Sequence, residues 1–234
     1  ALPIFRDISS TKQLALGTRG ETADGRKYRY ALAGAVTLAP GKLNVAAAHV
    51  SNHVNVVVQA AAAVGATQVS ATLGATAMTA GYYADGQLVV NDATGEGISY
   101  EINNNNPAVA SAGVATVTLV DPIKVALVAS TSEVSFIANP WSSIIVGPGA
   151  IAHRSVGVAN VSITAAYYGW VQTGGDCAVL SDGVISKGAG AIPSDAVAGA
   201  VEIEVAGTVT QRVGFAPEAT VDTEYRLVTL TIDT

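Results

Sequence analysis

Short runs of apolar and β-branched residues, broken at close intervals by turn-forming residues, constrain the fold of this chain most. From residue 54 onward, the runs are separated by turn formers such as NNNNP, DP, STS and NPW. Strands that recur about every eight to twelve residues are typical of antiparallel sandwiches and barrels. Ala-rich pieces at 46–50, 60–66 and 196–200 could form helical turns, but their β-branched neighbours disfavour long helices. The sequence therefore predicts an all-β protein.

The clearest local pattern is a hairpin predicted in GYYADGQLVVND. Tyr82 and Tyr83 precede the turn dipeptide Asp85-Gly86, and an apolar run follows it at residues 88–90. A second series of predicted strands begins after VGPGAIAHRSVG, residues 146–157, which we interpret as a linker. We therefore expect an extended N-terminal arm followed by two antiparallel β-sandwich or barrel-like domains, with boundaries at residues 1–42, 43–147 and 148–234.

Positive charge is concentrated in the predicted arm. The first 42 residues hold seven basic and three acidic residues, a net charge of +4, whereas the other 192 hold five basic and fifteen acidic residues, a net charge of −10. The stretch GTRGETADGRKYRY also contains an Asp24-Gly25 turn dipeptide. An extended strand after this turn would place Arg26, Tyr28 and Tyr30 on one face, opposite Lys27 and Arg29.

An acidic protein surface is the partner that best fits this charge distribution. Arginines interleaved with tyrosines can also bind nucleic acid, but the rest of the chain is acidic and four net charges give weak phosphate affinity at physiological salt. Charged residues make up only 13% of the chain, about half the usual share. A surface of Ser, Thr, Asn and Gly would explain this, and so would a surface covered by other subunits, which is the explanation we favour. The candidate protein-docking residues are Arg19, Arg26, Lys27, Tyr28, Arg29 and Tyr30.

The histidines and the single cysteine form weak patterns for chemistry. His49 and His53 have the spacing of zinc-binding helices, but Val50 stands where a hydrolytic site has Glu, and the segment is predicted as strand. Cys177 could act as a nucleophile with the distant His153 as base. No local feature would lower its pKa, however, so we interpret it as a small buried residue. A single cysteine excludes an internal disulfide.

Acidic and glycine-rich stretches also lack a specific signature. Glu202 and Glu204 share one face of a predicted strand, where they mark its solvated side. The oxygen-rich stretches at 91–97 and 103–106 could hold structural calcium, but their spacing fits no EF-hand and is typical of turns. Residues 186–195 lack the phosphate-loop and dinucleotide fingerprints. We predict no catalytic residue, no cofactor and no metal site.

Neither a membrane helix nor an export signal is predicted. The longest apolar region, residues 54–66, is interrupted by Asn55 and Gln59 and is shorter than the roughly 18 residues that a membrane helix needs. The N-terminus lacks a basic region followed by an apolar one. Ala1 is consistent with removal of an initiator methionine, which predicts synthesis in a cytoplasm.

Four stretches occur together in one order: GTRGETADGRKYRYALAGAVTLAPGKL, AGYYADGQLVVNDATGEGISYEI, VTLVDPIKVAL and YYGWVQTGGDCAVLSDG. In this order they resemble the head-associated structural proteins of tailed bacteriophages, of the capsid decoration or cement type. The resemblance covers most of the chain and is carried by glycines, aromatics and turn residues. It implies a β-rich, often trimeric protein that grips the capsid with an extended arm, here residues 19–30. It also implies that Trp170 packs in the second β domain, while Cys177 departs from the pattern.

We therefore expect a non-enzymatic virion protein, made in the host cytoplasm, that decorates or cements the outer capsid surface. Its partners would be the major capsid protein and further copies of itself, as a homotrimer, with neither nucleic acid nor membrane. Deleting residues 1–42 should then abolish attachment and leave the β domains folded. The alternatives are another assembling surface protein (a tail or fibre component, a surface-layer or filament subunit) or a carbohydrate-binding module with a platform of Tyr82, Tyr83, Tyr167, Tyr168 and Trp170.

Overall fold

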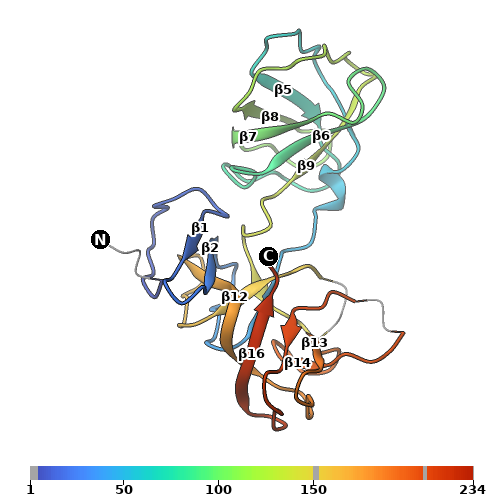
Figure 1. The fold of residues 1–234 in the computed structure, drawn as a ribbon. Helices are drawn as coiled ribbons and strands as arrows, with labels where there is room; N and C mark the ends of the chain where they lie inside the picture. The colour runs from blue at the N-terminus through green and yellow to red at the C-terminus, as the bar shows by residue number, and fades with distance from the viewer. Residues whose placement is uncertain (1–4, 150–152, 208–209, 234) are drawn as a thin grey trace. The chain divides into compact units, whose positions relative to one another are not determined.

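β-Strands dominate the computed structural model, which describes residues 5–149, 153–207 and 210–233. Within these ranges the only helical element is one 3-10 turn, η1, at Ser51–His53. The chain divides into two units (Figure 1): unit 1 combines Ala1–Ala47 with Pro140–Thr234, and unit 2 is Ala48–Asn139. Each unit has its own antiparallel sheet and its own core. The predicted all-β fold with two barrel- or sandwich-like domains is confirmed.

Unit 2 is a six-stranded sheet that nearly closes on itself. The strands follow the order β4-β9-β6-β7-β8-β5, and a bridge between Val58 and Ala71 joins the two ends of this order. Alternate residues of each strand face the inside, as Ala115, Val117 and Leu119 do on β8. The strand bounds are β4 Val56–Val57, β5 Gln68–Thr72, β6 Gln87–Asp92, β7 Ser99–Asn105, β8 Val114–Leu119 and β9 Glu133–Ile137.

The hairpin predicted around Asp85-Gly86 is wrong. Tyr82 and Tyr83 lie in a turn, and β6 pairs with β7 and β9 instead. The reason is packing: the fully buried Tyr83 ring contacts Phe136 in the core of unit 2. The Tyr83 hydroxyl is hydrogen-bonded to Nδ1 of His53 at 2.7 Å. A buried aromatic with a satisfied hydroxyl outweighs the local preference of this segment for a strand.

Unit 1 is a ten-stranded antiparallel sheet with the order β10-β3-β11-β12-β16-β15-β13-β14, while β2 pairs with β12 and β1 pairs with β2. The bounds are β1 Arg19–Glu21, β2 Lys27–Leu32, β3 Leu43–Val45, β10 Ile145–Val146, β11 Ser155–Ala159, β12 Tyr168–Leu180, β13 Gly190–Pro193, β14 Val201–Ile203, β15 Gly214–Phe215 and β16 Tyr225–Thr231.

Strand β12 organises unit 1 because it pairs with β11 along one edge and with two strands in succession, β2 and β16, along the other. Its first part, residues 168–174, pairs with β2, and its second part, residues 174–180, pairs with β16 (Figure 1). The register shifts between Gln172 and Gly174, and Gly175 has a φ of +76°, a conformation that glycine adopts without strain. The glycine pair therefore lets one strand turn from one neighbour to the next.

The sequence predicts an arm that ends at residue 42 and two consecutive domains that meet at residue 147, but the structure divides the chain differently. Residues expected as an arm form β1 and β2 of unit 1, and unit 2 is inserted between β3 and β10. The chain leaves and returns at neighbouring positions, since Val45 pairs with Ile145. The expected linker at 146–157 overlaps β10 and β11, and its residues 150–152 lie outside the described residues.

Removing residues 1–42 should unfold unit 1 and leave unit 2 folded. The truncation removes Tyr28 and Tyr30, whose burial contributes about 1.5–3 kcal/mol each, out of the about 5–15 kcal/mol that keeps a domain folded. In a ¹H–¹⁵N correlation spectrum of the truncated chain, the signals of β12 and β16 should lose their dispersion. Signals of β6 to β9 are the internal control. If the signals of β12 and β16 stayed dispersed, residues 1–42 would be an arm that unit 1 does not need in order to fold.

Candidate functional site

The N-terminal basic segment folds into a hairpin that carries all six predicted docking residues. The predicted turn at Asp24-Gly25 joins β1 to β2, and Gly25 has a φ of +82°. The Thr22 amide donates to the Arg26 carbonyl at 3.0 Å, which closes the turn. Because β2 lies between β1 and β12, the two faces of this hairpin meet different surroundings.

One face of β2 is packed inside the protein. Tyr28 and Tyr30 are only 2% and 4% exposed and form a cluster with Trp170. The Phe5 ring stacks on Tyr28 with centroids 4.2 Å apart, and Tyr168 stacks on Tyr30 at 5.8 Å. The two predicted docking tyrosines therefore hold β2 against β12 and cannot reach a partner. Trp170, which belongs to β12, is buried in this cluster of unit 1.

Arg29, on the other face of β2, is committed to the C-terminal part of the chain. Its guanidinium donates to both carboxylate oxygens of Asp233, at 2.7 and 3.0 Å, and to the Gly17 carbonyl at 2.8 Å. It also lies 5.0 Å from the ring centroid of Trp141. Arg19 reaches Asp233 at 3.9 Å. These contacts tie β1, β2 and the end of β16 together.

Arg19 and Arg26 keep the most accessible charge of the predicted set. The Arg19 side chain is exposed, and Arg26 is partly exposed with its Nε donating to Asp24 at 2.9 Å. Lys27 is half-buried, and its alkyl chain lies over Gly174. The structure thus retains two of the six candidates as surface cations and uses the others wholly or partly inside the fold.

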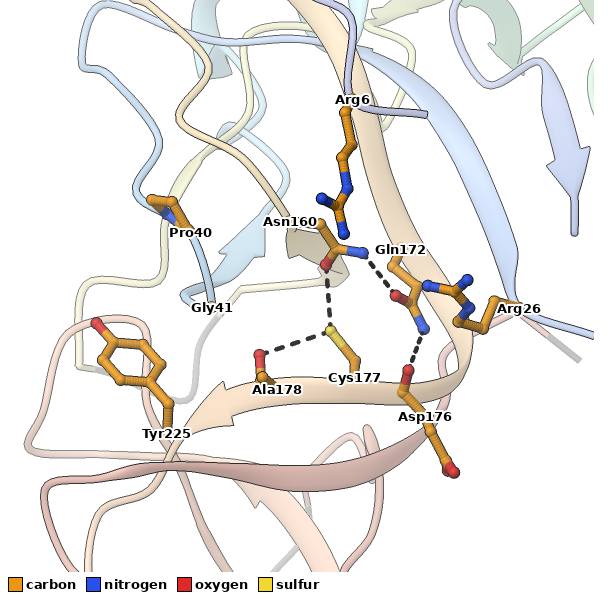
Figure 2. A pocket seen from close by; sticks show the side chains of 10 residues that line it. All are labelled: Arg6, Arg26, Pro40, Gly41, Asn160, Gln172, Asp176, Cys177, Ala178 and Tyr225. Carbon is orange, nitrogen blue, oxygen red and sulfur yellow. Dashed lines mark hydrogen bonds between the residues drawn. The ribbon is translucent and has the colours of Figure 1, made fainter. Parts of the chain in front are cut away.

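A pocket of about 600 Å³ opens beside Arg26 (Figure 2). It forms where β12 and β16 meet the turn that precedes β3. Arg6 reaches into it from the N-terminal segment, and Cys177 forms part of its wall. The lining residues are Arg6, Arg26, Pro40, Gly41, Asn160, Gln172, Asp176, Cys177, Ala178 and Tyr225.

Two side-chain amides form a rigid polar part of this pocket. Asn160 Nδ2 donates to Gln172 Oε1 at 2.7 Å, and Gln172 Nε2 donates to the carbonyl oxygens of Gly174 and Asp176 at 3.0 and 2.9 Å. The Cys177 thiol donates to Asn160 Oδ1 at 3.3 Å (Figure 2). Since each amide is held by several bonds, the orientation of both is set before any ligand arrives.

Cys177 is a buried thiol. Burial raises its pKa to about 12, and the nearby Arg26 lowers it only in part. Its side chain packs with the apolar core around Val179 and Val228. This environment agrees with the interpretation of Cys177 as a small buried residue.

The other candidate residues are dispersed. His53 lies in η1 and not in a strand, and its Nε2 is 2.9 Å from the Thr76 carbonyl oxygen. Glu204 pairs with Arg212, while burial raises the pKa of Glu202, which accepts a bond from the Asp195 amide at 3.5 Å. In the described ranges, no three His, Cys, Asp or Glu side chains are grouped to hold a metal ion.

The proposed sugar platform does not form. Tyr83 and Trp170 are buried, and the Tyr82 ring meets the edge of Tyr83 at a centroid distance of 4.9 Å. Tyr168 stacks on the buried Tyr30. Tyr82 and Tyr83 belong to unit 2, and the other three residues belong to unit 1.

The structure shows an exposed apolar sheet face next to the pocket, which was not predicted from the sequence. Tyr225 and Leu227 on β16 are 51% and 45% exposed, and Phe215 on β15 is 40% exposed. Phe215 pairs with Thr229, so by strand alternation the three side chains share one face. The two-residue period of β16 signalled that Tyr225 and Leu227 lie together, but it did not show that their face stays open.

Comparisons with protein-family models, with curated proteins and with solved structures found no match for this chain. Among the described residues, no helix is long and apolar enough to cross a membrane.

Replacing Asp233 should weaken unit 1 in a pH-dependent way. The hydrogen bond from Arg29 lowers the pKa of Asp233, although desolvation opposes the shift. The ion pair thus stabilises the fold fully above the unfolded pKa of about 3.9, and this contribution is lost as the pH falls through the folded pKa. Asp233→Asn should cost about 1 kcal/mol at pH 7, since the pair is partly screened, and less near pH 3, as measured by urea unfolding.

Asp24→Asn is the matched control for Asp233→Asn. Asp24 also pairs with an arginine of the hairpin, but its carboxylate is exposed and screened by salt. The Thr22 hydroxyl and Arg26 both donate to Asp24 and lower its pKa, but the site is exposed, so the control should reduce the free energy of unfolding less than Asp233→Asn does at 0.15 M salt. Equal effects of the two substitutions would mean that Asp233 does not anchor the end of β16.

The thiol of Cys177 should react slowly with Ellman's reagent. Raising the pKa from 9.0 to about 12 lowers the thiolate fraction at pH 7 by about a thousandfold, and burial adds a steric barrier. The rate of labelling of the native protein should therefore be at least about a hundredfold below the rate in 6 M guanidinium chloride. Comparable rates would show that the pocket wall opens readily.

Proposed function

We propose that this protein is a virion structural protein that decorates or cements the outer surface of a tailed-phage capsid. The observation that carries the proposal is the open apolar face of β15 and β16, formed by Phe215, Tyr225 and Leu227, in a chain with few charges. Contiguous exposed apolar side chains mark surfaces that bind other proteins. The ordered sequence stretches that resemble head-associated phage proteins support a tailed-phage capsid as the kind of assembly.

Exposed apolar side chains on both units support a role in assembly. Val64 and Val109 in unit 2, and Val205 in unit 1, are more than half exposed. Each unit combines such side chains with a buried core of its own. An assembling protein benefits from this arrangement, because each unit folds on its own core and leaves apolar surface for neighbouring subunits.

The distribution of charge between the units differs from the distribution along the sequence. Unit 2 holds one basic and six acidic residues, a net charge of −5, and unit 1 holds eleven basic and twelve acidic residues, a net charge of −1. The basic hairpin is thus largely balanced within unit 1. We propose attachment through the surface around Arg19, Arg26 and the β15–β16 face, with the major capsid protein as partner and a homotrimer as the assembled form.

Electron microscopy of native particles that contain this chain tests the proposal. The two units, fitted separately, should account for density at regular sites on the outside of an icosahedral shell, with threefold symmetry within each site. Density in a tail, a fibre or a helical filament would contradict the decoration role. Finding only free particles with the mass of a single chain would contradict the assembly role as well.

A pair of substitutions tests which surface makes the attachment. Leu227→Asp places a charge at the centre of the apolar face and should abolish incorporation into particles. Val205→Asp changes a more exposed valine of the same unit, outside the strands and outside this face, and should be tolerated. Circular dichroism spectra of both variants check that unit 1 is still folded. Normal incorporation of Leu227→Asp would exclude this face as the contact.

A further inference from the structure

We propose that the pocket between Arg6 and Arg26 binds a carboxylate side chain of an extended acidic segment of a partner protein. The apolar side chain next to that carboxylate would lie against Pro40 and Tyr225. The location of this segment on the capsid surface rests on the proposed function, whereas the binding of the acidic segment does not. The pocket has a cationic half and an apolar half, and each half has a separate structural basis.

The cationic half has two guanidinium groups that come from different segments of the chain. Arg6 extends toward Asn160, and Arg26 extends toward Gln172 (Figure 2). Within the described part of the chain, Arg6 forms no ion pair, and the ion pair of Arg26 with Asp24 uses Nε. The terminal nitrogens of Arg26 are therefore open to a second acceptor. Arginine binds carboxylates with two parallel hydrogen bonds, which makes it specific for such planar groups.

The carboxylate of the pocket itself does not compete for these arginines. Asp176 lines the pocket, but its Oδ1 accepts a hydrogen bond from the Thr229 hydroxyl at 2.5 Å. Figure 2 shows the Asp176 side chain directed away from Asn160 and Arg6. The polar groups of Asn160 and Gln172 are already bonded to each other and to the backbone. An incoming acceptor would therefore meet the two arginines as the principal available donors.

The apolar half is shaped by a close approach of two segments. Gly41 has a φ of +69°, and a Cβ placed on it would lie 2.5 Å from the Tyr225 ring. The Leu180 amide donates to the Gly41 carbonyl at 2.9 Å, which holds the turn against β12. Beyond Tyr225 the surface continues along β16 to the exposed Leu227. A chain that places a carboxylate between the arginines can thus extend along an apolar surface.

The size and charge of the site favour an acidic peptide over nucleic acid. A volume of about 600 Å³ lies within the range of about 300–1,000 Å³ for small-ligand pockets and accommodates side chains of a short segment. Two arginines in a unit with a net charge of −1 give few phosphate contacts. The ring stack that could hold bases, Tyr28 with Phe5 and Trp170, is packed inside.

Titration of the full chain with a short acidic peptide tests this site. The probe is acetyl-Leu-Glu-Leu-Glu-amide, followed by ¹H–¹⁵N correlation spectra. Binding should shift the backbone signals of Gly41 and Ala178 and the Asn160 side-chain amide in a saturable manner. Arg6→Gln and Arg26→Gln should each weaken binding at least about tenfold, because each removes charge-assisted hydrogen bonds. Arg212→Gln, an arginine paired with Glu204 outside the pocket lining, should bind as the unchanged protein does.

Several outcomes would overturn the inference. No saturable shift at the pocket, or equal binding of acetyl-Leu-Gln-Leu-Gln-amide, would show that no carboxylate is recognised there. Equally tight binding of inorganic phosphate or of a thymidine oligonucleotide would assign the arginines to phosphate. Concentration-dependent shifts of the same signals without peptide would assign the face to a second copy. Particle incorporation is scored separately, so peptide binding without decoration would reject the proposed function and leave the pocket assignment intact.

Discussion

The pairing of β2 with β12 is the contact on which the rest of unit 1 depends. It joins residues about 140 positions apart, with Tyr30 opposite Trp170 and Tyr28 opposite Gln172. The aromatic cluster on one face and the Arg29–Asp233 ion pair on the other both use β2. The cost of closing so long a loop is offset by burial of large rings. Without β2, one edge of β12 would lose its partner strand and Trp170 its neighbours.

Because unit 2 is inserted between β3 and β10, one chain forms two separately folded units whose surfaces differ in charge and polarity. Each unit has its own sheet and buries its own core, so neither depends on the other for its apolar packing. Most of the net negative charge lies in unit 2, whereas unit 1 has nearly balanced charge and an open apolar face. A protein that contacts several neighbours can in this way present different chemistry to each of them.

The attachment surface proposed for unit 1 combines one apolar area with one cationic area. Tyr225 belongs to both, because it is exposed on β16 and lines the pocket that Arg6 and Arg26 enter. Apolar contact supplies most of the affinity in protein interfaces, while charged groups set orientation and partner choice. The hydrogen-bonded amides of Asn160 and Gln172 keep the pocket walls in place, so little ordering is needed when a segment binds.

Local pattern by itself determined the all-β class, the Asp24-Gly25 turn and the two faces of β2, because turn dipeptides and side-chain alternation act over a few residues. The tertiary structure decided what those faces contact. It buried Tyr28 and Tyr30, expected at a docking surface, and drew Tyr83 out of a predicted hairpin into a core. The pocket joins residues from distant segments, such as Arg6, Asn160 and Tyr225. Such sites follow from long-range strand pairing, and a single sequence carries no local signal for which distant strands pair.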